Sequence, residues 1–320
     1  MPVHGLALVR DANGRLGRRC IGLTQDEIDR GSRAVTASRA ELAWAQRVTV
    51  SAGTNGMAFT VIYRDADGFG FNEAGLGPAR KAALEAALAG ISRVIQGSVP
   101  VVVDAGFYHG EPNNLASARA TDFATVNGQM VPFALAAQMI GSSLNGGGSD
   151  IVTQFNVRDD WDYDPSGSLA PGKEPMMYTA MHEIVHGLGF AGSFDPDSGA
   201  LRNGAPTPYD LFVGRGTPSA QQLTNRPAGD VRADLVSDDL FFTGPGSQQA
   251  SVYSIRSQPL VKLYAPGSWV QGSSLSHVDQ NTYADVNVGL MTPSSFGAAS
   301  SQVDGLTASI LVDIGYKSAR

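Results

Sequence analysis

The stretch MHEIVHGLGF, residues 181–190, carries two histidines four positions apart, with a glutamate directly after the first. In an α-helix, residues four apart lie one turn from each other on the same face, so His182 and His186 can bind a single metal ion. Glu183 then projects beside that ion, where a carboxylate can accept and return a proton. These three residues predict metal-assisted hydrolysis.

The residues around the motif favour a helix. Apolar side chains recur at helical spacing, as Met177, Met181, Ile184, Val185 and Leu188. Pro175 suits the first turn of such a helix. The HExxH spacing on a helix is typical of zinc peptidases. The alternative interpretation is a structural helix with two partly buried histidines.

A catalytic zinc ion takes three protein ligands and leaves a fourth position for water, so one ligand must come from elsewhere. No glutamate follows Glu183, and the compact pattern HExxHxxGxxH would need histidine where the chain has Gly192. His277 in SSLSHVD is the one remaining downstream histidine, and Asp195 in GSFDPDSG is a competing carboxylate ligand. We favour His277, because imidazole suits zinc and Met291 in GLMTP follows it as a methionine turn would.

The chain has a single cysteine, Cys20 in RRCIG, so it cannot form an intramolecular disulfide. A thiolate is a good zinc ligand, and Arg18 and Arg19 beside it would favour the deprotonated form. The alternative interpretation is a small thiol without a role.

The composition is that of a globular protein, with 42% hydrophobic and 17% charged residues. The net charge is −7, and the 23 basic residues are scattered, so we expect no nucleic-acid partner. Charges and glycines interrupt residues 1–25, which therefore resemble neither a signal peptide nor a membrane span. We expect no transmembrane segment, and a monomer.

Several predicted elements precede the motif and must position it. Residues 57–63 and 98–107 have the pattern of strands, and residues 77–98 place apolar side chains at helical spacing behind Pro78, as Leu84, Leu88, Ile91 and Ile95. Residues 149–157 form a further strand candidate. The order indicates an α+β fold with a mixed sheet and a helix packed on it.

The second half of the chain is punctuated by glycine, proline, serine and asparagine up to about residue 300. We expect an irregular lobe there, with one terminal helix over residues 304–316, capped by Asp304. Tyr283 could assist an oxyanion through its phenol, although packing is its favoured role. His109 is expected in a loop. Residues 159–167 concentrate four aspartates and could hold Ca²⁺, but they lack a regular ligand spacing, which favours a solvated turn.

HEIVHGLGF, an insertion, SSLSHVD and then GLMTP resemble the leishmanolysin group of metzincins, in which the third zinc histidine lies far beyond the helix. DIVTQFN, YDLFV and LTASILVDIGY extend the similarity over most of residues 140–316, toward bacterial secreted members. The chain departs from the protozoan enzymes in lacking their many disulfides.

The resemblance implies a secreted zinc endopeptidase acting on proteins or peptides. His182, His186 and His277 would bind Zn²⁺, and Met291 would form the floor of the metal site. Glu183 would assist attack of zinc-bound water on the peptide bond as general base and then acid, without a covalent intermediate. The implied fold is metzincin-type, a twisted mixed sheet with a backing helix and an active-site helix, and a cleft between two lobes.

RRCIG resembles the prosegment motif of these enzymes, whose cysteine fills the fourth zinc position. It implies an inhibitory prosegment over residues 1–46, a catalytic subdomain over 47–191, and a second subdomain over 192–320 that holds the third ligand and the methionine turn. A cut near residues 40–50 would then activate the zymogen, and Cys20→Ala would be active without it.

Two interpretations remain open at this point. DIVTQFN (150–156) is our candidate for an exposed edge strand that pairs with extended substrate, and an interior strand is the alternative. A non-catalytic secreted adhesin or binding module with a structural zinc site is the alternative to an enzyme.

Overall fold

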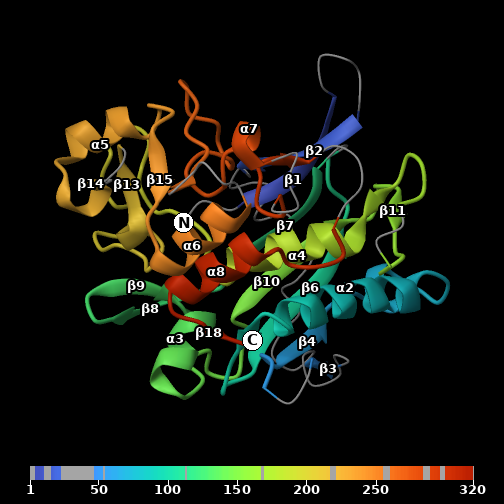
Figure 1. Cartoon of the computed structure of the whole chain (residues 1–320). Coiled ribbons are helices and arrows are strands. Elements are labelled where there is room, and N and C mark those ends of the chain that lie inside the picture. Colours follow the sequence, from blue (N-terminus) through green and yellow to red (C-terminus); the bar gives the residue numbers. More distant parts are fainter. Residues whose placement is uncertain are drawn as a thin grey trace.

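The computed structural model describes residues 4–10, 16–22, 47–52, 55–111, 114–166, 169–216, 221–254, 260–283, 289–295 and 300–319. A mixed eight-stranded sheet forms its centre (Figure 1). In spatial order the strands are β17 (Ser294–Ser295), β2 (Leu16–Gly22), β1 (His4–Arg10), β7 (Asn114–Ala120), β10 (Ile151–Asn156), β6 (Val101–Tyr108), β4 (Phe59–Tyr63) and β3 (Arg47–Val50).

The middle of the sheet is parallel and its flanks are antiparallel. β4, β6 and β10 run parallel to one another, whereas β7 pairs antiparallel with β10 and β3 antiparallel with β4. Helix α2 (Gly77–Ser92) makes the crossover from β4 to β6 that parallel strands require. The predicted mixed sheet and backing helix are confirmed, except that Ile95 lies in the short strand β5 (Ile95–Gln96) rather than in the helix.

Helix α4 (Met176–Gly187) carries the HExxH motif, as predicted, and every one of its residues is buried. It packs against α2 and against strands β7 and β10 of the sheet. The helix lies close to β10 because Gly187 has no side chain: a Cβ there would come within 2.7 Å of the Ile151 side chain.

The described N-terminal residues, which the resemblance implies to be part of a prosegment, belong to the central sheet. β1 and β2 form an antiparallel hairpin, β1 pairs with β7, and β2 pairs with β17 near the other end of the chain (Figure 1). The sequence did not indicate the strand β2 because Arg18 and Cys20 face inward and Arg19 outward, so no apolar alternation appears. The predicted cut falls near residues 40–50. The part of this range before residue 47 lies outside the described residues.

The prediction that DIVTQFN is an edge strand is wrong. β10 lies between β6 and β7 and is hydrogen-bonded on both sides. β7 lies between β10 and β1, so the hairpin keeps it from being an edge strand.

The second half of the chain is more regular than expected. In place of one terminal helix, its described residues contain α5 (Ala228–Asp234), α6 (Pro245–Ser254), α7 (Gln280–Tyr283) and α8 (Gly305–Asp313). A small sheet adds β14 (Gln221–Gln222), β13 (Val213–Arg215), β15 (Leu240–Phe242) and β16 (Val261–Lys262). These elements are too short to show a clear periodicity in sequence, whereas α8 has the predicted cap, in which Asp304 accepts from the Thr307 amide.

The remaining elements are short. They are η2 (Gly70–Asn72), β8 (Phe123–Val126), β9 (Gln129–Pro132), α3 (Phe133–Ile140), β11 (Trp161–Asp162), β12 (Glu174–Pro175), η3 (Asp210–Phe212), η4 (Leu223–Asn225) and β18 (Lys317–Ser318). Across the described ranges, no helix combines the length and the hydropathy needed to cross a bilayer.

Candidate metal centre

Helix α4 presents His182 and His186 on one face, as their spacing predicts. Both rings are buried, and their Nε2 atoms lie 3.2 Å apart. The helix ends directly after this pair, because Gly189 takes a φ of 113°, a conformation that favours glycine, and redirects the chain.

His277 joins the pair from a segment that lies 91 residues beyond His186. Its Nε2 atom is 3.2 Å from Nε2 of His186 and 3.3 Å from Nε2 of His182, so the three nitrogens form a nearly equilateral triangle. Asp195, the competing ligand, lies outside this group. Its carboxylate pairs with Arg202 at 3.3 Å and caps its own turn by accepting from the Ser198 amide.

The thiol of Cys20 lies against the same triangle. Its Sγ is 3.0 Å from Nε2 of His182 and 4.0 Å from Nε2 of His186. The four ligand atoms all lie within 4.8 Å of one another, and all four residues are buried. A possible metal site of three histidines and one cysteine is therefore present.

The arrangement can be tested against the geometry of a tetrahedral ion. Zn–N distances of about 2.0–2.1 Å and a Zn–S distance of about 2.3 Å imply N···N separations near 3.3 Å and N···S separations near 3.6 Å. The observed N···N separations are 3.2–3.3 Å, and the two N···S separations lie on either side of the expected value. The three nitrogens thus fit a tetrahedral ion, and the Cys20 thiol lies next to the fourth position of such an ion.

Each histidine is held by a hydrogen bond at its other ring nitrogen. Nδ1 lies 2.6 Å from the Leu290 carbonyl in His182, 2.8 Å from the Phe190 carbonyl in His186, and 2.8 Å from the Ser273 carbonyl in His277. A carbonyl can only accept, so Nδ1 carries the proton and Nε2 keeps a lone pair for a metal.

The GLMTP segment lies beside the helix. Besides the Leu290 carbonyl, the Gly289 carbonyl accepts from the Tyr178 hydroxyl of α4 at 3.1 Å. Met291 is fully buried, and its carbonyl accepts from the Val278 amide, next to His277, at 3.0 Å. These contacts place the GLMTP segment next to the metal-binding histidines, and the methionine turn stays a prediction.

Glu183 is buried beside the histidines. One carboxylate oxygen, Oε2, accepts from the Ala118 amide of β7 at 2.8 Å, while Oε1 has no hydrogen-bond partner. Burial raises the pKa of Glu183 well above its usual range, although the Ala118 amide opposes this. A buried, half-satisfied carboxylate is costly, and such groups are found where function requires them.

The arginines next to Cys20 do not act on its thiol as expected. Burial, and then the charge of Glu183, raise the pKa of the Cys20 thiol. Arg18 instead pairs with Glu174, and the exposed Arg19 donates to the Ser294 hydroxyl. Deprotonation of the thiol would have to come from a coordinated metal ion.

The other predicted candidates lie away from the cluster. The Tyr283 hydroxyl accepts from the Lys262 amide at 3.2 Å and lies 3.3 Å from the Ser251 hydroxyl, contacts that suit a packing role. His109 packs against Phe69 in a tilted arrangement, with ring centroids 5.2 Å apart.

The aspartates of residues 159–167 are largely engaged in local contacts. Asp162 accepts from two backbone amides of its own loop, and Asp160 pairs with Lys173. Among the residues that the structure describes, the Cys20 cluster is the group in which three or more metal-ligating side chains converge. A calcium ion in the loop therefore gains no support.

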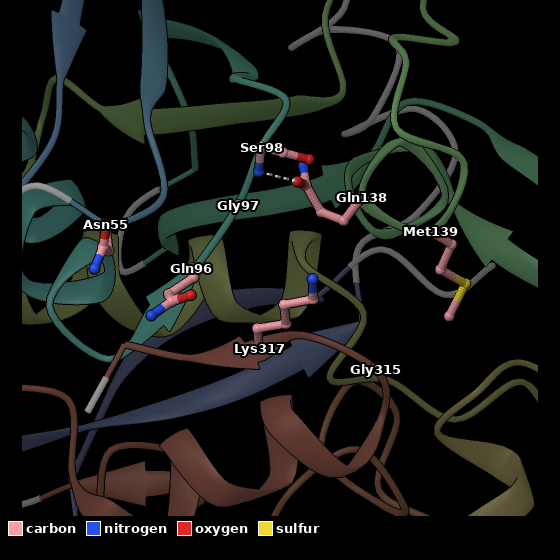
Figure 2. A pocket seen from close by; sticks show the side chains of 9 residues that line it. Asn55, Gln96, Gly97, Ser98, Gln138, Met139, Gly315 and Lys317 are labelled. Carbon is pink, nitrogen blue, oxygen red and sulfur yellow. Dashed lines mark hydrogen bonds between the residues drawn. The ribbon is translucent and has the colours of Figure 1, made fainter.

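The structure also has a polar pocket of about 500 Å³, and none of the predicted site residues lines it. Figure 2 shows Gln138 and Lys317 among the residues that line this pocket, with the Gln138 side chain accepting from the Ser98 amide. This bond ties α3 to the turn after β5, so Gln138 has a structural role there.

Two contacts of the site could not be found in the sequence. The Ala118 amide fixes Glu183, and Glu174 receives the inward Arg18. Both depend on strand register rather than on residue type. The only sequence signal for these contacts was the RRCIG motif, and its arginines were expected to favour the deprotonated form of the thiol rather than to form an ion pair.

No protein-family model matches the chain, and no curated protein and no solved structure matches it either.

Proposed function

We propose that the chain is a zinc-dependent endopeptidase of the leishmanolysin-like metzincin kind, secreted and held latent by its N-terminal segment. The observation that carries this proposal is the convergence of three imidazole Nε2 atoms on one centre, beside a buried glutamate with one oxygen unpartnered. Zinc is the ion that best suits three histidines and a thiolate in tetrahedral geometry.

When bound, zinc would supply the Lewis acidity that polarises a peptide carbonyl and activates water near neutral pH. Glu183 would accept the proton from the attacking water at Oε1 and pass it to the leaving amine. The Ala118 amide would hold Oε2 and thereby fix the direction of Oε1. A carboxyl group with a raised pKa suits both halves of this transfer.

Extended substrate would pair with β7. β7 lies between β10 and β1, and it would become an edge strand once the hairpin that contains β1 is released. Because the Ala118 amide of β7 also holds Glu183, substrate on this strand would lie next to the proton-transferring group. Proteins and peptides are therefore the substrate class, bound with main-chain hydrogen bonds.

Latency would have two components. The Cys20 thiol, which lies within 4.8 Å of the three histidine nitrogens, would hold the ion in place of water, and β1 of the hairpin pairs with β7 where substrate would bind. Residues 1–46 are the proposed prosegment, and cleavage near residues 40–50 would release it.

A structural metal site in a non-catalytic binding module is the second candidate. It is favoured by one observation, that four protein ligands close the coordination, as in structural zinc sites. Such a site gives no reason for Glu183 to be buried beside it with an unpartnered oxygen.

Zinc content and cleavage of a quenched peptide, measured before and after limited proteolysis, separate the two candidates. We expect about one zinc ion per chain, activity only after the cut, and a loss of at least about 100-fold in Glu183→Gln with zinc retained. Asp160→Asn, a carboxyl-to-amide change at an exposed residue that pairs with Lys173, is the control. Activity that survives Glu183→Gln would refute the mechanism, and zinc without activity in the processed chain would favour the binding module.

A further inference from the structure

The segment that carries the third histidine contains a strained residue, Leu275. Its φ is 72°, in the left-handed region that a leucine rarely adopts. Among the described residues, the other non-glycine residues with a positive φ are Asn127 and Asp238, whose side chains tolerate this conformation. Leu275 lies midway between Ser273 and His277, and the Ser273 carbonyl meets Nδ1 of His277 at 2.8 Å. The backbone angles of Leu275 therefore decide whether this carbonyl and this ring meet.

A strained conformation persists only where its surroundings hold it. The Leu275 amide donates to the Tyr264 carbonyl at 2.8 Å, and the Leu275 carbonyl accepts from the Tyr209 hydroxyl at 3.0 Å. Both polar backbone groups of Leu275 are therefore engaged. Of the two contacts, only the one from Tyr209 depends on a side chain.

Tyr209 is fully buried and contacts two other aromatic rings. Its ring centroid lies 5.2 Å from that of Phe190 and 5.0 Å from that of Phe242. Phe190 is the residue whose carbonyl meets Nδ1 of His186. Burial, and then the charge of Asp210, raise the pKa of the Tyr209 phenol well above its usual range, so the hydroxyl keeps its proton and donates. Tyr209 thus contacts the segments that hold two of the three histidines.

Gly192 provides the space for the Leu275 side chain. A Cβ at Gly192 would lie 2.3 Å from Cδ2 of Leu275, well inside van der Waals contact. The Gly192 amide also donates to the Ser276 hydroxyl, next to His277, at 3.1 Å. The position where the compact HExxHxxGxxH pattern would have its third histidine is thus filled by the residue that turns the chain toward His277.

We propose that Tyr209 and Leu275 are positioning residues for the third metal ligand, and that Gly192 gives them the space that this requires. Tyr209 holds the strained turn at Leu275, and the turn aims Nε2 of His277 at the metal. Strained backbone is concentrated at functional sites, where surrounding contacts offset its cost. This inference rests on the metal centre of the proposed function, although not on peptidase activity.

The first test measures the zinc affinity of the full, uncut chain by competition with a chelating dye. We expect Tyr209→Phe to bind zinc about tenfold more weakly, at the lower end of the effect of losing an outer hydrogen-bond partner. Tyr63→Phe is the control, because Tyr63 is a buried tyrosine of β4 whose hydroxyl donates to Oε1 of Glu85 at 2.8 Å. It should keep the wild-type affinity. Equal affinities of the wild type and Tyr209→Phe would overturn the proposal.

Leu275→Gly separates positioning from a general loss of packing. Glycine adopts a positive φ without strain, so in the Leu275→Gly background Tyr209→Phe should weaken zinc binding by less than about threefold. The same hydroxyl is lost in both backgrounds, so its effect on packing cancels. Leu275→Asn, which also tolerates a positive φ, replaces Leu275→Gly if that variant does not fold. A tenfold loss in both backgrounds would contradict a role through the strained turn.

Gly192→Ala tests the space for Leu275. Its new methyl group should displace the Leu275 side chain and weaken zinc binding about tenfold, and Leu275→Gly should restore the affinity. An unchanged affinity in Gly192→Ala would overturn the role of Gly192. If the expected affinities occur in a chain that cleaves no peptide after processing, the proposed function fails while the positioning of His277 stands. A wild-type chain that binds no zinc would overturn both.

Discussion

The three histidines of the metal centre are oriented before any ion binds. Their Nδ1 atoms meet the carbonyls of Phe190, Ser273 and Leu290, which belong to three different segments of the chain. Each ring is therefore fixed by backbone that the fold itself positions. Little side-chain freedom remains to be lost on metal binding, which favours tight coordination.

The choice of third ligand can be tested by zinc binding alone. We expect His277→Ala to weaken zinc affinity by more than about 100-fold, because even the loss of an outer hydrogen-bond partner costs 10–100-fold. Zinc content after dialysis against a weak chelator measures this. Asp195→Ala is the control and should retain its zinc, since its carboxylate pairs with Arg202. The opposite ranking would assign the ligand to Asp195.

At the residue scale, the sequence was sufficient for ligands that obey a local rule. His182 and His186 follow from helical spacing, and His277 followed by elimination among few histidines. The pairing of Arg18 with Glu174 spans 156 positions and depends on how β2 is registered against its neighbours. Residue types alone do not determine such a register, so the contact could not be predicted.

The hairpin of β1 and β2 is the element that most changes the expected behaviour of the chain. It connects β7 with β17, and the backbone of β2 also donates from Cys20 to the Pro293 carbonyl at 2.7 Å. These contacts do not involve the thiol. The hairpin should therefore remain in place when the thiol is removed.

For this reason we expect the uncut Cys20→Ala chain to be far less active than the processed wild type, although its metal has an open position. Cleavage of a short quenched peptide and of a folded protein substrate, each before and after limited proteolysis, measures the difference. Limited proteolysis should raise the activity of Cys20→Ala further. Full activity in the uncut variant would show that the thiol alone maintains latency.

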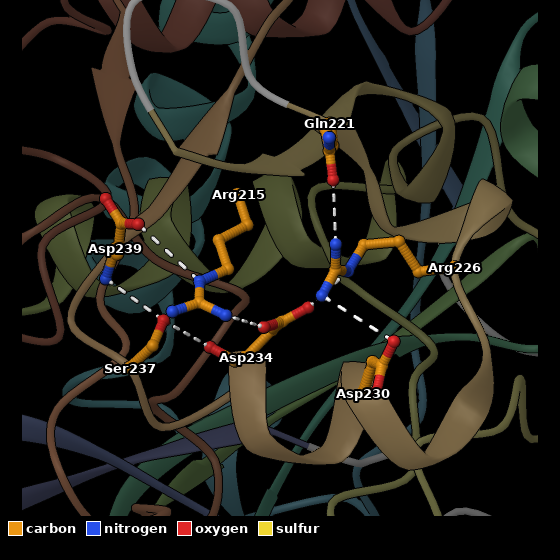
Figure 3. A network of polar contacts seen from close by, with 7 residues as sticks. All are labelled: Arg215, Gln221, Arg226, Asp230, Asp234, Ser237 and Asp239. Atoms are coloured by element: carbon orange, nitrogen blue, oxygen red, sulfur yellow. Dashed lines mark hydrogen bonds and ion pairs between the residues drawn. The ribbon is translucent and has the colours of Figure 1, made fainter.

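In the second half of the chain, a buried carboxylate connects α5 to the small sheet. Figure 3 shows Asp234, which has no exposed side-chain surface, between Arg215 and Arg226, each donating at 2.6 Å. Asp234→Ala should lower the free energy of unfolding by about 1–3 kcal/mol, because it removes the acceptor while the arginines keep access to water. Asp230→Ala, at the exposed rim, should change it by less than about 0.5 kcal/mol. Urea unfolding compares the two, and equal losses would contradict this account.

Helices whose own residues carry a strong signal could be predicted from the sequence. The position of a strand within the sheet depends on its neighbouring strands and could not be predicted. Pro78 and the apolar spacing of α2, and the Asp304 cap of α8, are features of a few neighbouring residues. Whether β10 is an edge or an interior strand depends on residues 114–120, which arrive from elsewhere in the chain. Sequence patterns within β10 do not contain that information.

At the scale of the whole molecule, the metal centre brings three separate parts of the chain together. Its ligands come from β2, from α4 and from the segment around residue 277, so one ion would link the N-terminal hairpin, the central helix and the second half of the chain. Metal binding to the folded state alone would then contribute to the stability of all three.

Chelation should accordingly destabilise the uncut chain. With free zinc at 1,000 times its Kd, removal of the ion is expected to lower the free energy of unfolding by about 4 kcal/mol. Calorimetry with and without EDTA, followed by restoration of zinc, measures this shift. The unfolding of His277→Ala should be insensitive to EDTA, and an unchanged wild-type transition would rule out a bound metal.

The order in which the ligands occur in the chain has a consequence during synthesis. Cys20 leaves the ribosome 162 residues before His182, and His277 follows 91 residues after His186. Under the proposed latency, the thiol would thus be present before any of the groups that it is proposed to block. The cell that makes the protein would then meet the inactive form first.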